Sequence, residues 1–166
     1  MHKNTYKGLV NKLPLILLMA LTIYFLGYFR NFLFVSINAQ SSSIYYKDTT
    51  PTLPAFMSFI SGKSYLYLIR LKWILTFLFS LSFCLSSMLF IRIFFTERIY
   101  LKICLIFYAF MMFASLFMMA LGYIIPSFSV HAFNISRNLM HITQSPFTVL
   151  LLFAIAFYHK EGSPQV

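Results

Sequence analysis

Residues 103–125 of this chain are ICLIFYAFMMFASLFMMALGYII, a run of twenty-three residues without a charge. About 20 predominantly apolar residues in a helix are enough to cross the hydrocarbon core of a bilayer. Pro126 follows at once, and a proline cannot continue the hydrogen-bond ladder of a helix. The run therefore predicts a membrane-spanning helix that ends before this proline.

Three further apolar runs flank this segment. Residues 73–91 contain no charge, and the run 13–29 continues beyond Arg30 and Asn31 as FLFVSI. The last run becomes strictly apolar only after Pro146 and needs the polar residues before it to reach across a bilayer. We predict a single all-α domain over residues 1–166, a four-helix transmembrane bundle with a polar extramembrane loop between helices 1 and 2. The expected helices cover about residues 13–37, 73–95, 100–125 and 132–158, and the loop covers residues 38–64.

The composition agrees with a membrane protein. Hydrophobic residues make up 60% of the chain and charged residues 10%, whereas soluble domains are roughly 45–50% apolar and about 25% charged. The net charge of +10 would indicate nucleic acid in a soluble protein. Here the thirteen Lys and Arg residues stand mostly at the ends of apolar runs, where they act as topology signals and headgroup contacts. We therefore expect phospholipid headgroups as partners and no nucleic acid.

The lysines and arginines of the short loops predict the orientation. With both termini inside, seven of them lie on the inner side and six on the outer side, counted from the sequence. Lys3, Lys7 and Lys12 precede the first apolar run, which usually dominates the orientation. We expect a multi-pass membrane protein with both termini cytoplasmic. The N-terminal run also resembles a signal peptide, but its cleavage pattern is poor, which favours a retained first helix.

The two cysteines lie inside apolar runs and form no CxxC motif, which argues against a thiol oxidase. Counted from a turn near Glu97, Cys84 and Cys104 differ in depth by six residues, or about 9 Å. We therefore expect two separate buried thiols that do not pair. Within the loop, AFMSFISG has the pattern of a short helix on the surface.

A polar stripe precedes the last apolar run. In HAFNISRNLMHITQSP, residues 131–146, the polar positions are spaced by three and four residues, as on one face of a helix. Three interpretations stay open. The helix lies flat at the interface with its polar face in water, or it spans the membrane with that face turned into the bundle, or His131 and His141 bind a metal. The two histidines are about 15 Å apart along a helix, which argues against a metal site and leaves no cofactor to expect.

Several cations are expected near one level on the outer side, where acids are almost absent. Only Asp48 is predicted on that side. An anion from outside the chain, such as a lipid phosphate, would balance these cations, since guanidinium groups bind phosphate through a planar fork. The alternative is that each cation reaches its own headgroups separately. The candidate residues for binding an anionic lipid or a partner are Arg30, Arg70, Lys72, Asn134, Arg137, Asn138 and His141.

Three stretches resemble a known family. They are RNFLFVSIN, YLYLIRLKW and SRNLMHITQSPFTVLLLFAIAFY, and they are similar to small four-helix proteins encoded beside bacterial exosortases, the exosortase-associated membrane proteins, including the exosortase F system type. The resemblance covers about residues 28–158. It implies an inner-membrane accessory to protein sorting or envelope export whose partner is a larger membrane protein, an exosortase-like enzyme. It implies no catalytic residues for this chain.

Two functions from different classes remain. The chain is expected to be a non-enzymatic accessory subunit that packs against a larger integral membrane protein. The alternative is an anionic-lipid binding or carrier protein that uses the outer Arg/Asn/His cluster. An enzyme is disfavoured, because the sequence lacks GxSxG, HExxH and P-loop motifs and its three acids are far in sequence from the candidate groups His131, His141 and Ser136. A transporter would need oligomerisation to build a pathway.

Overall fold

The computed structural model describes residues 3–47 and 53–162, and side chains from 13–47 and 53–159. Within these ranges the fold is all-helical, as predicted. The elements are α1 (Lys3–Tyr46), η1 (Ala55–Ile60), α2 (Tyr65–Phe94), α3 (Arg98–Ile124), η2 (Pro126–Phe128), α4 (Ser129–Thr143) and α5 (Pro146–Gly162).

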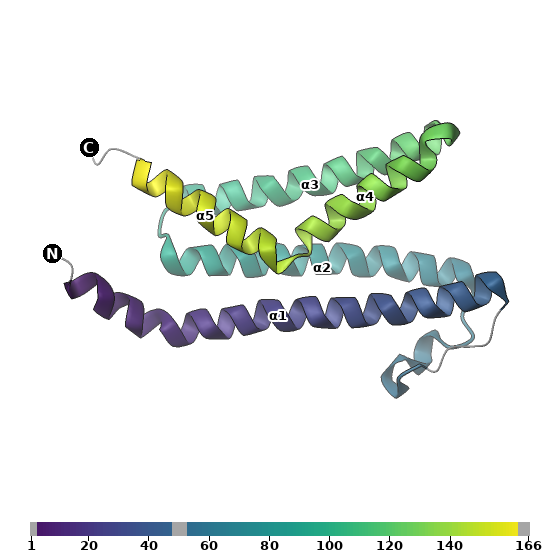
Figure 1. Ribbon diagram of the computed structural model, residues 1–166, viewed down its shortest axis with the longest axis horizontal. Coiled ribbons are helices and arrows are strands. Elements are labelled where there is room, and N and C mark those ends of the chain that lie inside the picture. Colours follow the sequence, from purple (N-terminus) through teal and green to yellow (C-terminus); the bar gives the residue numbers. More distant parts are fainter. Residues whose placement is uncertain (1–2, 48–52, 163–166) are drawn as a thin grey trace.

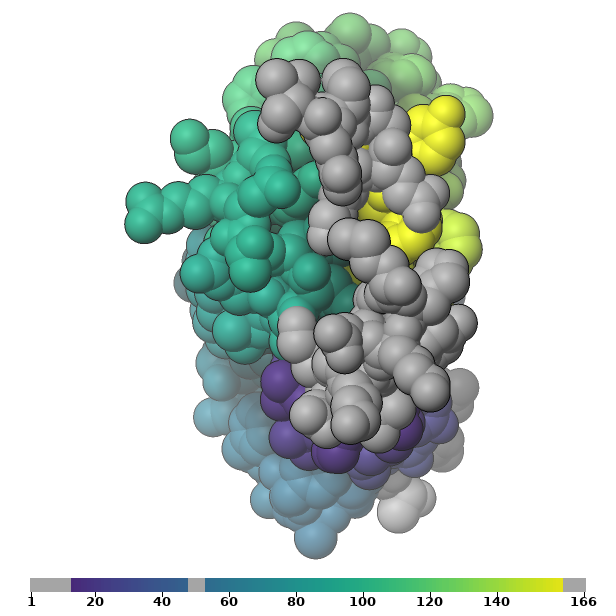
Figure 2. All heavy atoms as spheres, turned by 90° about the vertical axis from the view of Figure 1, so that its left-hand side faces the viewer, coloured from purple at the N-terminus to yellow at the C-terminus, as the bar shows by residue number. Residues whose placement is uncertain are grey.

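Three helices, α1, α2 and α3, are long and apolar enough to cross a membrane, and the bent pair α4–α5 makes a fourth span if it is counted as one. Successive spans run in opposite directions along one long axis, which is horizontal in Figure 1. One end, the η1 end, holds η1, η2 and the end of α1. The opposite end, the terminal end, holds the α2–α3 connection, the start of α1 and the end of α5. Figure 2 looks onto the terminal end, where the region of the α2–α3 connection is teal and the visible part of α5 is yellow.

The first helix is longer than predicted. It continues nine residues past the expected end, through the start of the segment predicted as a loop, and stops at Tyr46. Its last turns are helical because side chains at spacings of three and four pack inward: Leu33, Ile37 and Gln40 are buried, and Ile44 is partly buried. Lys47 ends the helix in the left-handed conformation, with φ of 55°.

The expected short helix in the loop is present as the 3₁₀ helix η1. Its Met57 and Ile60 are fully buried and pack in a cluster with Leu33, Ile37 and Leu68. The rings of Phe32 and Phe56 stack with their centroids 5.4 Å apart. The loop is therefore folded back onto the ends of α1 and α2, which fixes the η1 end of the bundle.

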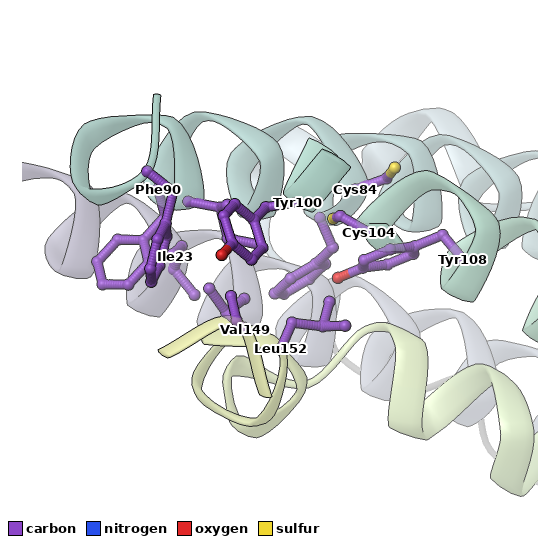
Figure 3. Close-up of a cluster of buried hydrophobic side chains, with 12 residues drawn as sticks. Ile23, Cys84, Phe90, Tyr100, Cys104, Tyr108, Val149 and Leu152 are labelled. Atoms are coloured by element: carbon purple, nitrogen blue, oxygen red, sulfur yellow. The ribbon is translucent and has the colours of Figure 1, made fainter. Parts of the chain in front are cut away.

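The thiols of Cys84 and Cys104 lie side by side, so the predicted difference in depth was wrong (Figure 3). The prediction counted both helices from Glu97. In the structure α2 ends at Phe94 and α3 begins at Arg98, so Cys84 stands ten residues before one end and Cys104 six after the other. The offset is four residues, or about 6 Å along the helix axis, and the two side chains are long enough to meet across it. Both cysteines are free and belong to an apolar cluster in the terminal half of the bundle.

The tightest helix contact joins α3 and α4. A methyl group added at Gly122 would lie 2.9 Å from Cβ of Ala132 and 3.4 Å from the backbone of Ser129. Further along, the hydroxyl groups of Ser115 and Ser136 are hydrogen-bonded at 2.7 Å. Small residues at this interface let the two backbones approach closely, as in other membrane helix pairs.

We predict that Gly122→Ala separates α3 from α4 and destabilises the fold by about 1–3 kcal/mol, as overpacking does elsewhere. Gly27→Ala is the matched control, since its new methyl group would meet Pro146 at an ordinary 3.6 Å. Thermal unfolding in detergent measures both. The double variant Gly122→Ala, Ala132→Gly should lose less stability than the two single variants lose together, because the smaller residue 132 makes room for the new methyl group. A loss equal to the sum of the two single losses would contradict this packing.

Candidate functional site: a buried arginine at the helix break

The last span is broken by a short sequence, Gln144-Ser145-Pro146. Proline disfavours helical backbone at the residue before it, and Ser145 instead caps the next helix by accepting a bond from the Phe147 amide at 3.2 Å. Pro146 occupies the first position of α5, where a proline is tolerated. The hydroxyl of Thr148 donates to the carbonyl of Ile142 across the break. The two helices consequently meet at a bend of 66°.

Gln144 ties this break to the other helices. Its amide nitrogen donates to the carbonyl of Thr76 at 2.7 Å and to the hydroxyl of Ser80 at 2.8 Å, both on α2. Its amide oxygen accepts a bond from Nε of Arg30 on α1 at 2.8 Å. Gln144 is 3% exposed, so these bonds form in a largely dry environment where each is costly to lose.

Arg30 is the charged group at the centre of the site. It is 7% exposed and makes three side-chain hydrogen bonds: Nε to Gln144, Nη1 to Oδ1 of Asn31 at 2.8 Å, and Nη2 to Nδ1 of His141 at 3.1 Å. The guanidinium also lies 5.1 Å from the ring centre of Phe34. All of these partners are neutral. A guanidinium has five N–H groups and no acceptor, so two N–H groups remain beyond these three bonds.

The bond from Arg30 also fixes the tautomer of His141. Because a guanidinium only donates, Nδ1 of His141 must accept. A neutral imidazole then carries its proton on Nε2, where it is a second donor. Both residues line a cleft of about 630 Å³ between α1 and the helix break. Its lining residues are Tyr24, Gly27, Tyr28, Arg30, Asn31, His141, Gln144, Ser145 and Pro146.

The site lies at membrane depth. Thr76 and Ser80 stand three and seven residues inside the uncharged run of α2 that begins at Trp73, which is about 4.5–10 Å along the helix axis. Half the hydrocarbon core is about 15 Å thick. The α4–α5 break also lies near the middle of the length of α2 and α3 (Figure 1). Arg30, expected where α1 approaches the outer interface, is joined through Gln144 to this uncharged part of α2.

The other predicted site residues are staggered and do not share one level. Nζ of Lys72 donates to Oδ1 of Asn38 at 2.7 Å, and Asn38 is eight residues beyond Arg30 on α1, about 12 Å nearer the η1 end. Arg137 lies close enough to Lys72 and to His141 for electrostatic repulsion. Three further predicted residues are exposed and do not line the cleft: Arg70, Asn134 and Asn138.

The polar stripe of α4 matches neither membrane interpretation in full. The helix packs along α3 through Ala132, Ser136 and Met140, which excludes a helix lying separately on the surface. Only the C-terminal end of the stripe, at His141 and Gln144, contacts another helix through polar side chains that bond Arg30. Among the described residues no group of three His, Cys, Asp or Glu side chains could hold a metal ion.

Sequence reasoning missed part of the site. It placed Gln144 on the polar stripe without giving it a role, and it assigned no role in the site to Tyr24, Tyr28, Thr76 or Ser80. The only signal for Gln144 was its spacing from His141 on the polar stripe. An isolated Ser or Thr in an apolar run, such as Ser80 or Thr76, gives no signal of a site. Comparison of the chain with family models, with curated proteins and with solved structures found no match.

We predict that Gln144→Leu destabilises the protein by about 1–3 kcal/mol, the cost of leaving a buried donor or acceptor without its partner. The variant keeps the side-chain size but removes three hydrogen bonds to Arg30, Thr76 and Ser80. Ser145→Ala is the matched control one residue away and should cost less, because it removes one capping bond. Thermal unfolding in detergent compares the two, and equal stability of Gln144→Leu and the parent would contradict the role of Gln144.

Proposed function

We propose that this chain binds the anionic headgroup of a membrane amphiphile, a phosphate or a carboxylate, in the cleft beside Arg30. The observation that supports this proposal is the buried guanidinium at membrane depth, whose hydrogen-bond partners are all neutral. Ionisable residues at membrane depth are rare and usually mark a functional site.

The energetic argument concerns charge. An arginine at the centre of a membrane helix costs about 2.5–3.5 kcal/mol in insertion measurements. Three neutral hydrogen bonds satisfy N–H groups but leave the net charge in place. Glu97 is the one acid whose side chain the structure describes, and it precedes α3 at the terminal end. An anion in the cleft would therefore offset a cost that the described side chains leave unbalanced.

The donors in the cleft suit an anionic oxygen. Arg30 has two further N–H groups, and Nε2–H of His141 is a third donor. A cationic or purely apolar ligand would gain nothing from these groups. Charge-assisted bonds of guanidinium to phosphate or carboxylate are among the stronger hydrogen bonds in proteins.

The surroundings of the cleft suit a ligand with an apolar chain. Tyr24 and Tyr28 line it from α1, and each is 64% exposed. Their rings stand beside the polar groups at a depth where lipid chains surround the protein. A headgroup at Arg30 can therefore keep its chain in the membrane, so we propose an amphiphile in preference to a free ion.

We propose a second candidate, a non-enzymatic accessory subunit of a sorting or export system in the bacterial inner membrane, with both termini cytoplasmic. The exposed amides of Asn134 and Asn138 favour it. They flank Ser136, which is bonded to Ser115 near the middle of the uncharged run of α3. Amide side chains at such depth hydrogen-bond across helices, and a helix of a larger membrane protein would supply the partner.

We predict that Arg30→Gln weakens binding of dodecyl phosphate and of dodecanoate about 30-fold, since a bond to a charged group contributes about 1.5–3 kcal/mol. Arg30→Lys keeps the charge but loses the planar fork of N–H groups. Its affinity for each ligand should therefore lie between that of the parent and that of Arg30→Gln. Calorimetric titration of the detergent-solubilised protein measures the affinities, and the two ligands distinguish phosphate from carboxylate.

Arg92→Gln is the matched control, because Arg92 is exposed near the terminal end of α2 and bonds the carbonyl of Thr96. It should bind both ligands as the parent does. Dodecyltrimethylammonium should not bind at Arg30 in any variant. Equal affinity of the folded Arg30→Gln variant and the parent for both anions would remove the proposal.

A further inference from the structure

A series of cationic and donor side chains lies in the cleft and on its η1 side; two of them, Arg30 and His141, line the cleft. Lys72 is the member nearest the η1 end, level with Asn38, to which it donates a hydrogen bond. Arg137 stands four residues, about one turn, before His141 on α4, and it lies close enough to Lys72 for electrostatic repulsion. His141 accepts a hydrogen bond from Arg30 at 3.1 Å, and Arg30 is the last member of the series. We call Lys72, Arg137, His141 and Arg30 the donor series.

The donor series spans three helices that are far apart in sequence. Lys72 belongs to α2, Arg137 and His141 to α4, and Arg30 to α1. Lys72 and Arg137 are close enough to repel each other, and no acid with a described side chain stands in the series. Packing three helices so that cations approach one another is unfavourable in itself. An anionic group moving along the series would relieve this repulsion at each step.

Among the side chains of residues 13–47 and 53–159, no comparable series leaves the cleft toward the terminal end. The segment of α5 after Pro146 is FTVLLLFAIAFY, and α1 from Leu13 to Phe29 is equally free of charge. Between them lies the apolar cluster that includes Ile23, Val149 and Leu152 (Figure 3). A headgroup that moved past Arg30 toward the terminal end would lose its polar contacts and enter this packed core.

We propose that the donor series admits the anionic headgroup from the leaflet at the η1 end alone, and that Arg30 is the end of its path. This inference rests on the proposed function and adds a direction to it. The protein would then take its amphiphile from one leaflet and hold it at mid-membrane without passing it to the other. Lys72 and Arg137 would speed the approach, and Arg30 would hold the bound headgroup.

Stopped-flow binding of a fluorescent alkyl phosphate to the protein in phosphatidylcholine nanodiscs tests the approach. The double variant Lys72→Gln, Arg137→Gln should associate about tenfold more slowly than the parent and dissociate at a rate within about threefold of it, as expected of charges that steer approach. Its association rate should also lose most of its dependence on salt. Arg70→Gln is the matched control, since Arg70 is exposed on the same helix two residues before Lys72 and lies outside the series.

The outcomes separate the two proposals. Loss of binding in Arg30→Gln together with unchanged rates in the double variant would overturn the donor series and keep the site. Unchanged binding in Arg30→Gln would overturn the site itself. Circular dichroism of each variant confirms that it is folded.

A second measurement tests the closed end of the path. Vesicles of phosphatidylcholine with a trace of fluorescent phosphatidic acid are treated with dithionite, which bleaches only the outer leaflet. With the protein present, about half of the fluorescence should survive, as in protein-free vesicles. Complete bleaching that depends on the protein would show passage between leaflets and overturn the one-sided path.

Discussion

The side-chain amide of Gln144 holds three helices together at the point where the last span is broken. Its nitrogen bonds α2 and its oxygen bonds Arg30 of α1, while its backbone ends α4. An amide can donate and accept at the same time, so one residue bonds the carbonyl of Thr76 and the buried hydroxyl of Ser80 and orients the guanidinium. Replacement by any apolar residue would leave both α2 and Arg30 without these bonds.

The break at Pro146 gives this amide its position. A continuous helix would pack its side chains along one line, whereas the bend of 66° lets α4 follow α3 while α5 enters the apolar cluster of the terminal half. The free backbone groups at the break are satisfied by Ser145 and Thr148. Irregular backbone at membrane depth is tolerated where it is buried or lines a polar cavity, and the cleft beside Arg30 provides such a cavity.

Much of the fold could be predicted from the sequence, since four apolar runs and a proline determine the spans and the break. The ends of α1 and the contact of Cys84 with Cys104 could not, because both depend on how helices pack on one another. Arg30 was recognised as a candidate from its charge inside an apolar run. Its depth depends on which residues face it from α2 and α4, and periodicity within one helix carries no information on that. Thr76 contributes a backbone carbonyl, which any residue type would supply.

The balance of charge at Arg30 links the fold to the proposed function. A cation that is buried among neutral partners, level with the uncharged run of α2, would be stabilised by an anion beside it. Solid-state NMR can test this directly by measuring dipolar coupling between the phosphorus of a bound alkyl phosphate and ¹⁵N-labelled arginine side chains. A bidentate contact places phosphorus about 4 Å from the guanidinium nitrogens, so we expect strong coupling that disappears in Arg30→Lys and persists in Arg92→Gln. Coupling that is absent in the parent, or that survives the loss of Arg30, would contradict binding at this site.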